Sequence, residues 1–439
     1  MRYALCGELV MEKVDVIIVG GGLAGLSCAY ELADSGMTVI VLERGDFSGS
    51  KNVTGGRIYL HPLRNYLPDL WKEAPLERHV TKEILTLMGE TNSTTLELYS
   101  DRLNRTPYPS YTILRAKFDR WLADLVSEKG IFVIPQKTVD DLIKEGEKVI
   151  GIRAGDEEIG ADCVVAADGI LSFMAEKAGL RQPFKPGHFA LGFKEVIQLD
   201  PKTIEDRFRL GEGEGAAQLF VGSLTKGMMG GGFLYTNLDS LSLGIVVGIH
   251  SLNLKEPREE VYKLLDEFKE RSEIKNLIRG GNVTEYSAHL ITEGGIQIKP
   301  KVYGDGILVV GDAAGLGLNM LVTVRGMEYA MASGVLAGRT IKKAKEKNDF
   351  SAFSLSDYEK LLNESFIIKE MNTFKNSLSI LENKRLFSKY PQAISDLFEK
   401  VMWVDEHPKE GLYKTISEGL KKEFFNWQTF KDWLQFRRI

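Results

Sequence analysis

Three glycines near the start of the chain have a spacing that can bind a dinucleotide. Gly20, Gly22 and Gly25 form a G-x-G-x-x-G pattern directly after an apolar, β-branched run. In a strand, turn and helix unit, the first glycine makes the tight turn and the second lets a pyrophosphate approach the helix N-terminus. The third glycine lets the helix pack against the strand. Leu23 and Ala24 lie inside the pattern, so the whole turn is a candidate cofactor-binding segment.

A carboxylate follows this motif at the distance expected for ribose recognition. A second apolar run, Thr38 to Leu42, is followed by Glu43 and Arg44, and Glu43 lies roughly 20 residues after the first glycine. An acid at this place accepts a hydrogen bond from a ribose 2′-hydroxyl. A lone glycine motif is a weak signal, but strand, helix, second strand and terminal acid together predict a bound dinucleotide.

The position of the motif favours FAD over a nicotinamide cofactor. It lies at the N-terminal end of a 439-residue chain, and no second G-x-G-x-x-G of this quality follows. One dinucleotide site at the start of a long chain indicates a tightly bound flavin whose electrons arrive from elsewhere. We therefore do not expect NADH or NADPH alone to reduce it.

Two later strand ends carry residues that a cofactor can contact. The apolar runs 161–166 and 307–310 predict buried strands, and open α/β sheets bind ligands at the carboxyl ends of their strands. The candidates that follow these runs are Ala167, Asp168, Gly169, Gly311, Asp312 and Gly315. The loop that contains Gly55, Gly56 and Arg57 is either a plain connector or a further contact to the cofactor, since its glycines permit close backbone approach.

The composition is that of a globular protein in a reducing compartment. Hydrophobic residues make up 44% and charged residues 27% of the chain, and the net charge of −5 gives no indication of nucleic-acid binding. The three cysteines lie far apart, which disfavours disulfides and a cysteine metal cluster, so no metal site is predicted. We expect no signal peptide, and no spanning helix, since the longest apolar stretch, 306–324, is interrupted by polar residues.

The order of these motifs resembles the glutathione-reductase-type FAD proteins. The glycine motif with its acid comes first, then the strand that ends in Asp168-Gly169, then Gly311-Asp312-Ala313-Ala314-Gly315 before a helix. The resemblance implies an α/β fold in which Asp312 hydrogen-bonds the ribityl chain or a hydroxyl on the pyrophosphate side. It also implies that the N-terminus of the following helix faces the N1 and O2 edge of the flavin, where its dipole favours the anionic reduced form.

Within that superfamily the chain is similar to the electron-transfer-flavoprotein:quinone oxidoreductases and their bacterial nitrogen-fixation-type relatives. The residues behind this are Lys51–Gly56, Tyr111–Asp119, Gly230–Tyr235, Glu293–Gly295 and Gly311–Gly315, with Asn319 and Gly326. The resemblance adds Arg115 and Asn319 to the expected FAD contacts. It implies quinone contacts at Gly231, Gly232, Phe233, Gly294 and Gly295.

This resemblance implies an electron-transfer subunit. FAD accepts electrons from a reduced electron-transfer flavoprotein of two subunits and passes them to a membrane quinone, so no catalytic side chain is assigned. The cysteine-rich ferredoxin domain of long family members has no counterpart in this sequence, which implies an obligatory small ferredoxin-like iron-sulfur subunit as partner. That partner is expected against the aromatic helices after Phe424. We expect a cytoplasmic protein, peripheral on the inner face of the membrane.

The elements divide the chain into three expected parts. An FAD-binding Rossmann domain comprises residues 11–85, 112–180 and 286–345, a β-rich quinone or substrate domain comprises 86–111 and 181–285, and a C-terminal helical region comprises 346–439. Helices are predicted at Arg115–Lys129, Arg258–Arg271 and Thr323–Lys343. The late aromatics, 424–436, favour a packed C-terminal helix over a membrane anchor. The glycines of the β-rich part are equally consistent with ordinary bulges and turns.

Three other functions fit parts of the same pattern. A geranylgeranyl-reductase-like FAD enzyme shares the scaffold, but those relatives carry Tyr-x-Trp-x-Phe-Pro where this chain reads Gly232-Phe233-Leu234-Tyr235-Thr236. An FAD-dependent monooxygenase that takes hydride from NADPH is compatible with Asp168-Gly169. A non-redox binding protein that has lost the flavin is disfavoured, because every FAD-facing motif is intact.

Overall fold

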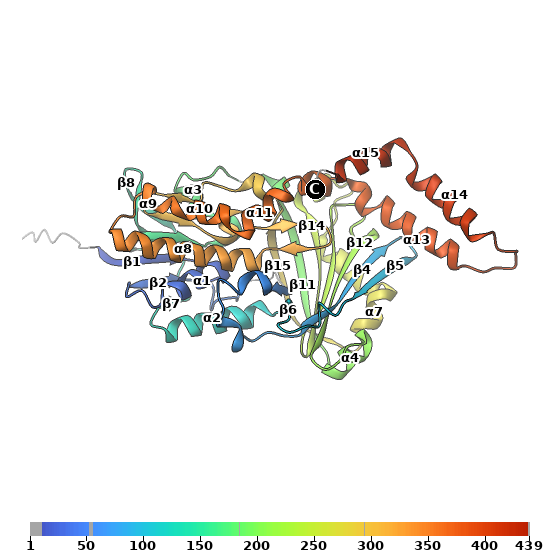
Figure 1. The fold of residues 1–439 in the computed structure, drawn as a ribbon, viewed down its shortest axis with the longest axis horizontal. Helices are drawn as coiled ribbons and strands as arrows, with labels where there is room; N and C mark the ends of the chain where they lie inside the picture. The colour runs from blue at the N-terminus through green and yellow to red at the C-terminus, as the bar shows by residue number, and fades with distance from the viewer. Residues whose placement is uncertain (1–10, 52–55, 184, 294, 438–439) are drawn as a thin grey trace, which may run out of the picture.

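The computed structural model describes residues 11–51, 56–183, 185–293 and 295–437 as two large sheets flanked by helices (Figure 1). The first sheet contains β1 (Glu12–Val19), β2 (Val39–Leu42), β7 (Phe132–Ile134), β8 (Asp141–Glu145), β9 (Lys148–Ala154), β10 (Glu157–Ala166), β16 (Tyr303–Gly304) and β17 (Ile307–Val309). The second contains β3 (Arg57–Tyr59), β4 (His79–Met88), β5 (Ser93–Tyr99), β6 (Ser110–Thr112), β11 (Phe189–Gln198), β12 (Glu214–Gly222), β13 (Gly230–Thr236), β14 (Ser240–Gly248) and β15 (Asn282–Thr292). A separate small hairpin consists of β18 (Leu318–Asn319) and β19 (Val324–Arg325).

The helices of the first half and of the second sheet are α1 (Leu23–Leu32), α2 (Arg115–Glu128), α3 (Phe173–Lys177), α4 (Pro201–Phe208), α5 (Ile249–Asn253), α6 (Val261–Glu270) and α7 (Ser272–Ile278). The later ones are α8 (Met327–Lys347), α9 (Ala352–Leu355), α10 (Asp357–Glu364), α11 (Phe366–Thr373), α12 (Ser377–Leu381), α13 (Lys389–Met402), α14 (Leu412–Phe424) and α15 (Trp427–Phe436).

The centre of the first sheet is parallel, in the order β17-β10-β1-β2-β7. Toward their carboxyl ends the inner strands consist mostly of valine, isoleucine and alanine and are buried on both faces, as expected of parallel strands covered by helices. Phe132 and Ile134 of the edge strand β7 are exposed. Val19 of β1 lies opposite Leu42 of β2 and Ala166 of β10, and Ala166 lies opposite Val309 of β17. The carboxyl ends of these four strands therefore meet at one edge.

Helices α1 and α8 lie side by side against this sheet (Figure 1). Small residues let their backbones approach closely, since a Cβ added to Gly334 of α8 would lie 2.1 Å from the carbonyl oxygen of Ala24. Helix α8 follows the second sheet in sequence and α1 follows the first strand. The first sheet and its helices are thus assembled from both ends of the chain.

The second sheet has the order β15-β11-β14-β13-β12-β4-β6-β3, with β5 paired to β4. Only β12 and β4 run parallel to each other. One face packs on α4, α6 and α7 through an apolar core that includes Phe208, Phe220 and Phe268. On the other face, Leu219 and Val246 line a cavity that the first sheet also borders.

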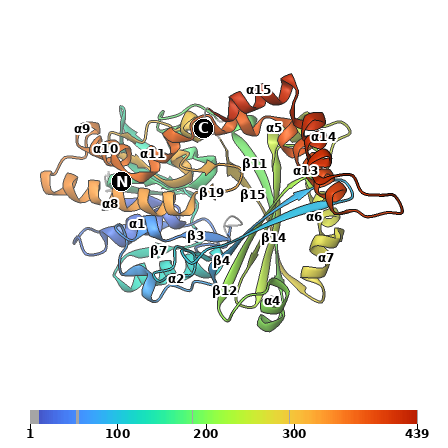
Figure 2. The ribbon, with the colours of Figure 1, turned by 45° about the vertical axis from the view of Figure 1, so that its right-hand side comes forward.

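The helices after α8 form two groups. Helices α9 to α11 extend the core of the first sheet with buried side chains such as Tyr358 and Ile367. Helix α13 packs on β4, β5 and β12, and α14 extends outward beyond it (Figures 1 and 2). Helix α15 turns back, and its buried Asp432 pairs with Arg385. The expectation that the late aromatics pack was wrong for most of them, since Phe425 is 77% and Trp427 68% exposed. No helix in the described ranges is long and apolar enough to cross a membrane.

The predicted helices are confirmed with shifted ends. The helix predicted from Thr323 begins at Met327, because 324–325 pairs with 318–319 in the β18–β19 hairpin. Strand β3 and the start of β4 pair within the second sheet, although residues 57–59 and 79–85 fall in the range assigned to the FAD-binding domain. The domain boundaries themselves stay a prediction.

Candidate cofactor-binding site

Four of the predicted segments lie at the same edge of the first sheet. Gly20 follows β1, Glu43 follows β2, Ala167 follows β10, and Gly311 lies just beyond β17. The aligned strand ends make them neighbours, and the Gly20 N–H donates a hydrogen bond of 2.8 Å to the carbonyl oxygen of Leu42. This is the edge at which open parallel sheets bind their ligands.

The glycine turn is closed toward the protein and open toward the cavity. Gly20 has φ of +112°, and an added Cβ there would lie 2.2 Å from the carbonyl oxygen of Ala167. An added Cβ on Gly25 would lie 2.1 Å from the carbonyl oxygen of Gly20, so both positions require glycine. At Gly22 an added Cβ meets nothing within 4 Å in the described structure, and no side chain there caps α1. This open helix N-terminus fits a pyrophosphate.

The Glu43 carboxylate is fixed beside that turn by two backbone groups. Gly21 N–H donates to Oε2 at 2.9 Å, and Gly45 N–H donates to Oε1 at 2.6 Å. Glu43 and Arg44 both line the cavity. The carboxylate thus lies where the sequence placed the ribose of a dinucleotide.

Two aspartates at the strand ends have incomplete hydrogen bonding. Asp168 Oδ2 accepts a 3.0 Å hydrogen bond from Met174 N–H, whereas its buried Oδ1 has no partner among the described residues. The Asp312 carboxylate makes no hydrogen bond within the described ranges. Burial raises the pKa of both carboxyls, and the nearby charges of Arg115 and His289 partly oppose this for Asp312. Buried acceptors of this kind are ordinarily completed by a bound group, and ligand hydroxyls such as those of FAD fit them.

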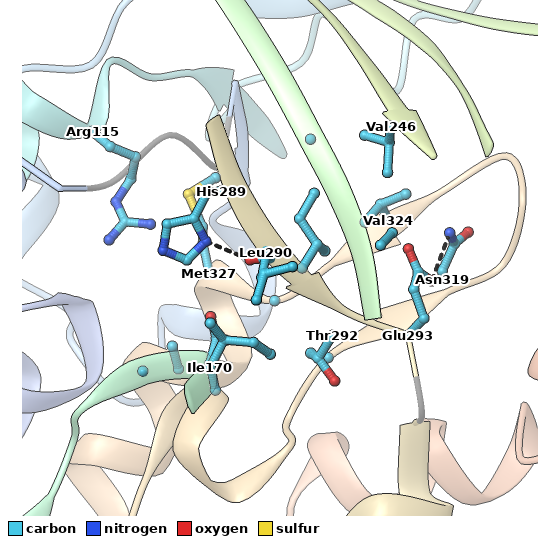
Figure 3. Close-up of a pocket in the computed structure, with 18 of the residues that line it drawn as sticks. Arg115, Ile170, Val246, His289, Leu290, Thr292, Glu293, Asn319, Val324 and Met327 are labelled. Carbon is cyan, nitrogen blue, oxygen red and sulfur yellow. Dashed lines mark hydrogen bonds between the residues drawn. The ribbon is translucent and has the colours of Figure 1, made fainter. Parts of the chain in front are cut away.

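Arg115 and His289 lie beside each other at one end of the cavity (Figure 3). Arg115 donates two hydrogen bonds to the buried carboxylate of Asp119, at 2.8 and 2.7 Å. Burial disfavours the Arg115 cation, but Asp119 outweighs it and raises the pKa of Arg115. His289 Nδ1 hydrogen-bonds the carbonyl group of Leu290. Sequence reasoning found Arg115 by resemblance and missed His289, which lies in an unremarkable strand.

Most of the predicted site residues border one cavity of about 630 Å³. Its lining includes Gly20, Gly22, Leu23, Ala24, Glu43, Arg44, Gly56, Arg57, Arg115, Ala167, Asp168, Gly169, Gly231, Gly232, Phe233, Asp312 and Asn319. Gly25, Gly295, Gly311 and Gly315 do not line it. At Gly311, close packing explains the glycine, because an added Cβ would lie 2.7 Å from Cβ of Ala24. Gly55 and Gly294 fall outside the described residues.

Gly56 and Arg57 connect the predicted cofactor loop to the second sheet. A Cβ added to Gly56 would lie 2.0 Å from Cδ2 of Tyr235 on β13. Arg57 forms an ion pair with Glu83 of β4, with one hydrogen bond of 2.7 Å, and donates another of 3.1 Å to Ser110. These contacts tie the end of the loop and β3 to the other strands of the second sheet.

The predicted quinone segment on β13 alternates between two faces. A Cβ added to Gly232 would lie 2.8 Å from Phe268, in the core on the far face of the sheet. One added to Gly231 would lie 2.5 Å from the carbonyl oxygen of Phe220 on β12. Close packing thus explains why both positions carry glycine. Phe233, in contrast, stacks on Tyr235 with 5.3 Å between ring centroids, and its side chain lines the cavity.

Glu293 follows β15 and faces Asn319 in the same cavity (Figure 3). Asn319 Nδ2 donates a 3.0 Å hydrogen bond to Glu293 Oε2. Burial raises the pKa of Glu293 to about 7, and the Asn319 hydrogen bond partly opposes this. The segment was predicted by resemblance for its glycines, while the carboxyl group itself was missed.

Two cations on the cavity wall, Lys194, which is buried, and Arg325, which is partly buried, were also missed. Lys194 of β11 lies 3.3 Å from Glu285, and burial lowers the pKa of Lys194. Arg325 pairs with Glu328 and Glu370, while its buried Nη2 has no partner among the described residues. A lysine at an otherwise apolar strand position was the available sequence signal for Lys194.

Three family models match this chain. A model described as "FAD dependent oxidoreductase" matches residues 15–104, which include the glycine turn and Glu43. One described as "ETF-QO, ubiquinone-binding" matches 189–291, which spans β11 to β14 and most of β15. One described as "ETF-QO/FixC family C-terminal domain" matches 378–439.

Whole-chain relatives agree with these matches. The "Probable electron transfer flavoprotein-quinone oxidoreductase YdiS" of Escherichia coli strain K12 is 42% identical over 94% of this chain and 95% of its own length. Protein FixC of the same strain is 41% identical over 94% of this chain and 96% of its own.

A solved structure shares the fold at lower identity. The geranylgeranyl bacteriochlorophyll reductase-like protein of Thermoplasma acidophilum superposes with a TM-score of 0.71, at 22% identity, over 95% of this chain and 98% of its own. Identity at this level supports a common architecture and says nothing of a common substrate.

Proposed function

The chain belongs to the ETF-QO/FixC family, and from this premise we propose that it takes electrons from a reduced electron-transfer flavoprotein onto FAD and delivers them to a quinone. The observation that carries the proposal is the ubiquinone-binding match over 189–291. Strands from that segment line the same cavity as the glycine turn and Asp312. An electron donor site and an acceptor site on one cavity are what such a reaction requires.

Bound FAD supplies the redox chemistry of this reaction, and the chain binds and orients it. The open N-terminus of α1 at Gly22 would hold the pyrophosphate, and Glu43 would accept from the ribose. The unpartnered carboxylate of Asp312 would accept from the ribityl chain or a hydroxyl on the pyrophosphate side. Electron transfer of this kind needs no acid or base on the cofactor-binding edge.

We place the quinone along the cavity face of the second sheet. The strand register puts Gly231 opposite Val246, then Gly192, then His289, so β13 and β15 are three strand spacings apart. At about 4.8 Å per spacing this is roughly 14 Å, which is wide enough for a quinone ring and the start of its tail. Glu293, beyond the end of β15, is the side chain that would meet the ring, and Phe233 on β13 belongs to the apolar wall along which the tail would lie.

The surface around α13 to α15 is our proposed docking site for a small ferredoxin-like subunit. Exposed aromatics gather there, including Trp403, Phe425, Trp427 and Trp433. Exposed apolar side chains in this number mark an interaction site. The two described cysteines, Cys28 and Cys163, are buried in α1 and β10, where they pack as small apolar residues. A cluster would therefore take its thiolates from the partner.

We also propose that the protein acts in the cytoplasm, on the inner face of the membrane. A membrane quinone keeps its isoprenoid tail in the bilayer, so the cavity must open near that surface for the ring to enter. Binding of the purified chain to sedimented lipid vesicles checks this, and no binding in the presence of both partner proteins would contradict it.

The main test is a rapid-mixing comparison of electron donors. Reduced electron-transfer flavoprotein should bleach the flavin absorbance of the purified chain, and added quinone should restore it in the complex of the chain with its ferredoxin-like subunit. NADH and NADPH, mixed without a partner, should bleach it only at a negligible rate. Rapid bleaching by either nucleotide would instead support a monooxygenase or a geranylgeranyl-reductase-like enzyme.

The subunit proposal has a separate test. The chain expressed alone should contain FAD and no iron, and co-expression with a cysteine-rich small ferredoxin-like protein should give a complex that contains both. Stoichiometric iron and acid-labile sulfide in the isolated chain would contradict the proposal. Full quinone reductase activity without a second subunit would contradict it as well.

A further inference from the structure

Glu293 differs from the other carboxylates that line the cavity. Glu83 is paired with Arg57, Glu43 is held by backbone N–H groups, and Asp168 and Asp312 lie on the cofactor edge of the first sheet. Glu293 lies beyond the end of β15, on the second-sheet side, and is only 5% exposed. Within the described ranges no cation pairs with it.

The hydrogen bonds around Glu293 leave one of its oxygens available. Asn319 Oδ1 accepts a 2.9 Å hydrogen bond from Leu321 N–H, which orients the amide so that Nδ2 points at Glu293 Oε2. The other oxygen, Oε1, has no hydrogen-bond partner among the described residues. Figure 3 shows this pair at the cavity wall beside Val324. One oxygen is therefore anchored and the other is free to meet a ligand.

A quinone that gains two electrons must also take up two protons, and only one accompanies the electrons from the reduced cofactor. We propose that Glu293 is the acid that supplies the second proton to a quinone oxygen. The O–H bond of the carboxyl group breaks as an O–H bond forms on the quinol, and the carboxylate left behind is held by Asn319 Nδ2. The carboxylate then regains a proton from water. This inference rests on the proposed quinone reductase function and goes further by naming a catalytic residue.

The electrostatics of the site suit this role. Burial without a cation raises the pKa of Glu293 to about 7, so near neutral pH a large fraction of the group carries a proton to give. Among the described residues, the Asn319 amide is the one group that hydrogen-bonds the Glu293 carboxyl, and it favours the carboxylate once formed. His188 contacts the Glu293 backbone, whose N–H donates to the His188 carbonyl oxygen at 2.9 Å. A general acid works best when its pKa lies near the working pH.

The test compares two electron acceptors with one preparation, the complex of the chain with its ferredoxin-like subunit. In Glu293→Gln, reoxidation of the reduced flavoprotein by quinone should slow by about a hundredfold, the lower range for loss of a general acid. Reoxidation by ferricenium, which takes an electron and no proton, should be unchanged. The wild-type quinone rate should fall as pH rises through about 7 while the variant rate stays flat. Glu293→Asp should restore part of the quinone rate.

An independent readout does not need turnover. Infrared difference spectra between acidic and alkaline buffer should show the carbonyl band of a protonated carboxyl group that titrates near neutral pH, and Glu293→Gln should lack this band. An equal loss with quinone and ferricenium would mean a structural role and overturn the proposal, as would an unchanged quinone rate. A wild-type protein that reduces ferricenium but no quinone would instead refute the proposed function, whatever the infrared band shows.

Discussion

At residue scale, the Glu43 carboxylate has two tasks in one place. It accepts from Gly21 and Gly45, and those bonds hold it where a ribose hydroxyl can reach it. Hydrogen bonds to a charged group are worth about 1.5 to 3 kcal/mol, so Glu43→Ala should weaken FAD binding by roughly one to two decades. Fluorescence titration of the apoprotein with FAD measures this. Glu43→Gln, which keeps an acceptor at the same place, should lose less, and equal affinity in all three proteins would contradict the assignment.

Larger side chains at Gly22 and at Gly25 should impair the protein for different reasons. At Gly22 an added side chain has free space in the protein, so Gly22→Val should fold normally but lose most of its FAD, because the side chain fills the approach of the pyrophosphate. Gly25→Val should instead lower the stability of the apoprotein, because its Cβ would lie 2.1 Å from the Gly20 carbonyl oxygen. Flavin content and apoprotein Tm separate the two outcomes. A Gly22→Val protein that purifies fully yellow would refute the placement.

The proposed cofactor residues could be brought together from sequence because their signal is local. Gly20, Gly22 and Glu43 are recognisable from one short stretch, and parallel pairing then brings them together. Glu293 acquires its chemistry differently, since its hydrogen-bond partner Asn319 lies 26 residues later in another hairpin and its burial comes from both sheets. A carboxyl pKa set by long-range packing has no signature in the local sequence.

At element scale, strand β13 decides which of the predicted quinone residues can act on a ligand. Its alternation directs Gly232 to the far core and leaves Phe233 on the cavity face. Phe233→Ala should therefore slow flavin reoxidation by quinone several-fold, through loss of an apolar wall, and leave flavin reduction by the protein donor intact. Gly231→Ala is the comparison, since it crowds the Phe220 carbonyl group and should lower Tm. If Phe233→Ala slowed both half-reactions equally, the pocket would be misplaced.

The positions of some elements were predicted wrongly because strand pairing determines them. Residues 57–59 and 79–85 follow the cofactor motif closely and were assigned to the same domain, yet they pair with β6 and β12 of the second sheet. Helix α8 was predicted to begin at Thr323. Residues 324–325 pair instead with residues 318–319 in the β18–β19 hairpin. In the first case a hydrogen-bond ladder between segments distant in sequence determines the pairing, and in the second a short hairpin does.

At the scale of the whole molecule, α14 and α15 present aromatic side chains that the rest of the described chain leaves exposed. Replacing Trp427 and Trp433 with serine should weaken binding of the ferredoxin-like subunit by tenfold or more, since buried tryptophans dominate interfaces. Co-purification from the co-expressed pair measures this. The FAD content and Tm of the chain alone should not change. If the amount of complex were undiminished, the proposed docking surface would be wrong.

The close packing of α8 on α1 has a consequence for how the protein is made. Strand β17 and helix α8, which complete the first sheet, extend to Lys347, so the nucleotide fold cannot close until most of the polypeptide has left the ribosome. At about 5 to 20 residues per second, the apolar β1–α1 unit waits for tens of seconds before its partners exist. During synthesis this unit is therefore a chaperone client, and the flavin is acquired only near the end of translation.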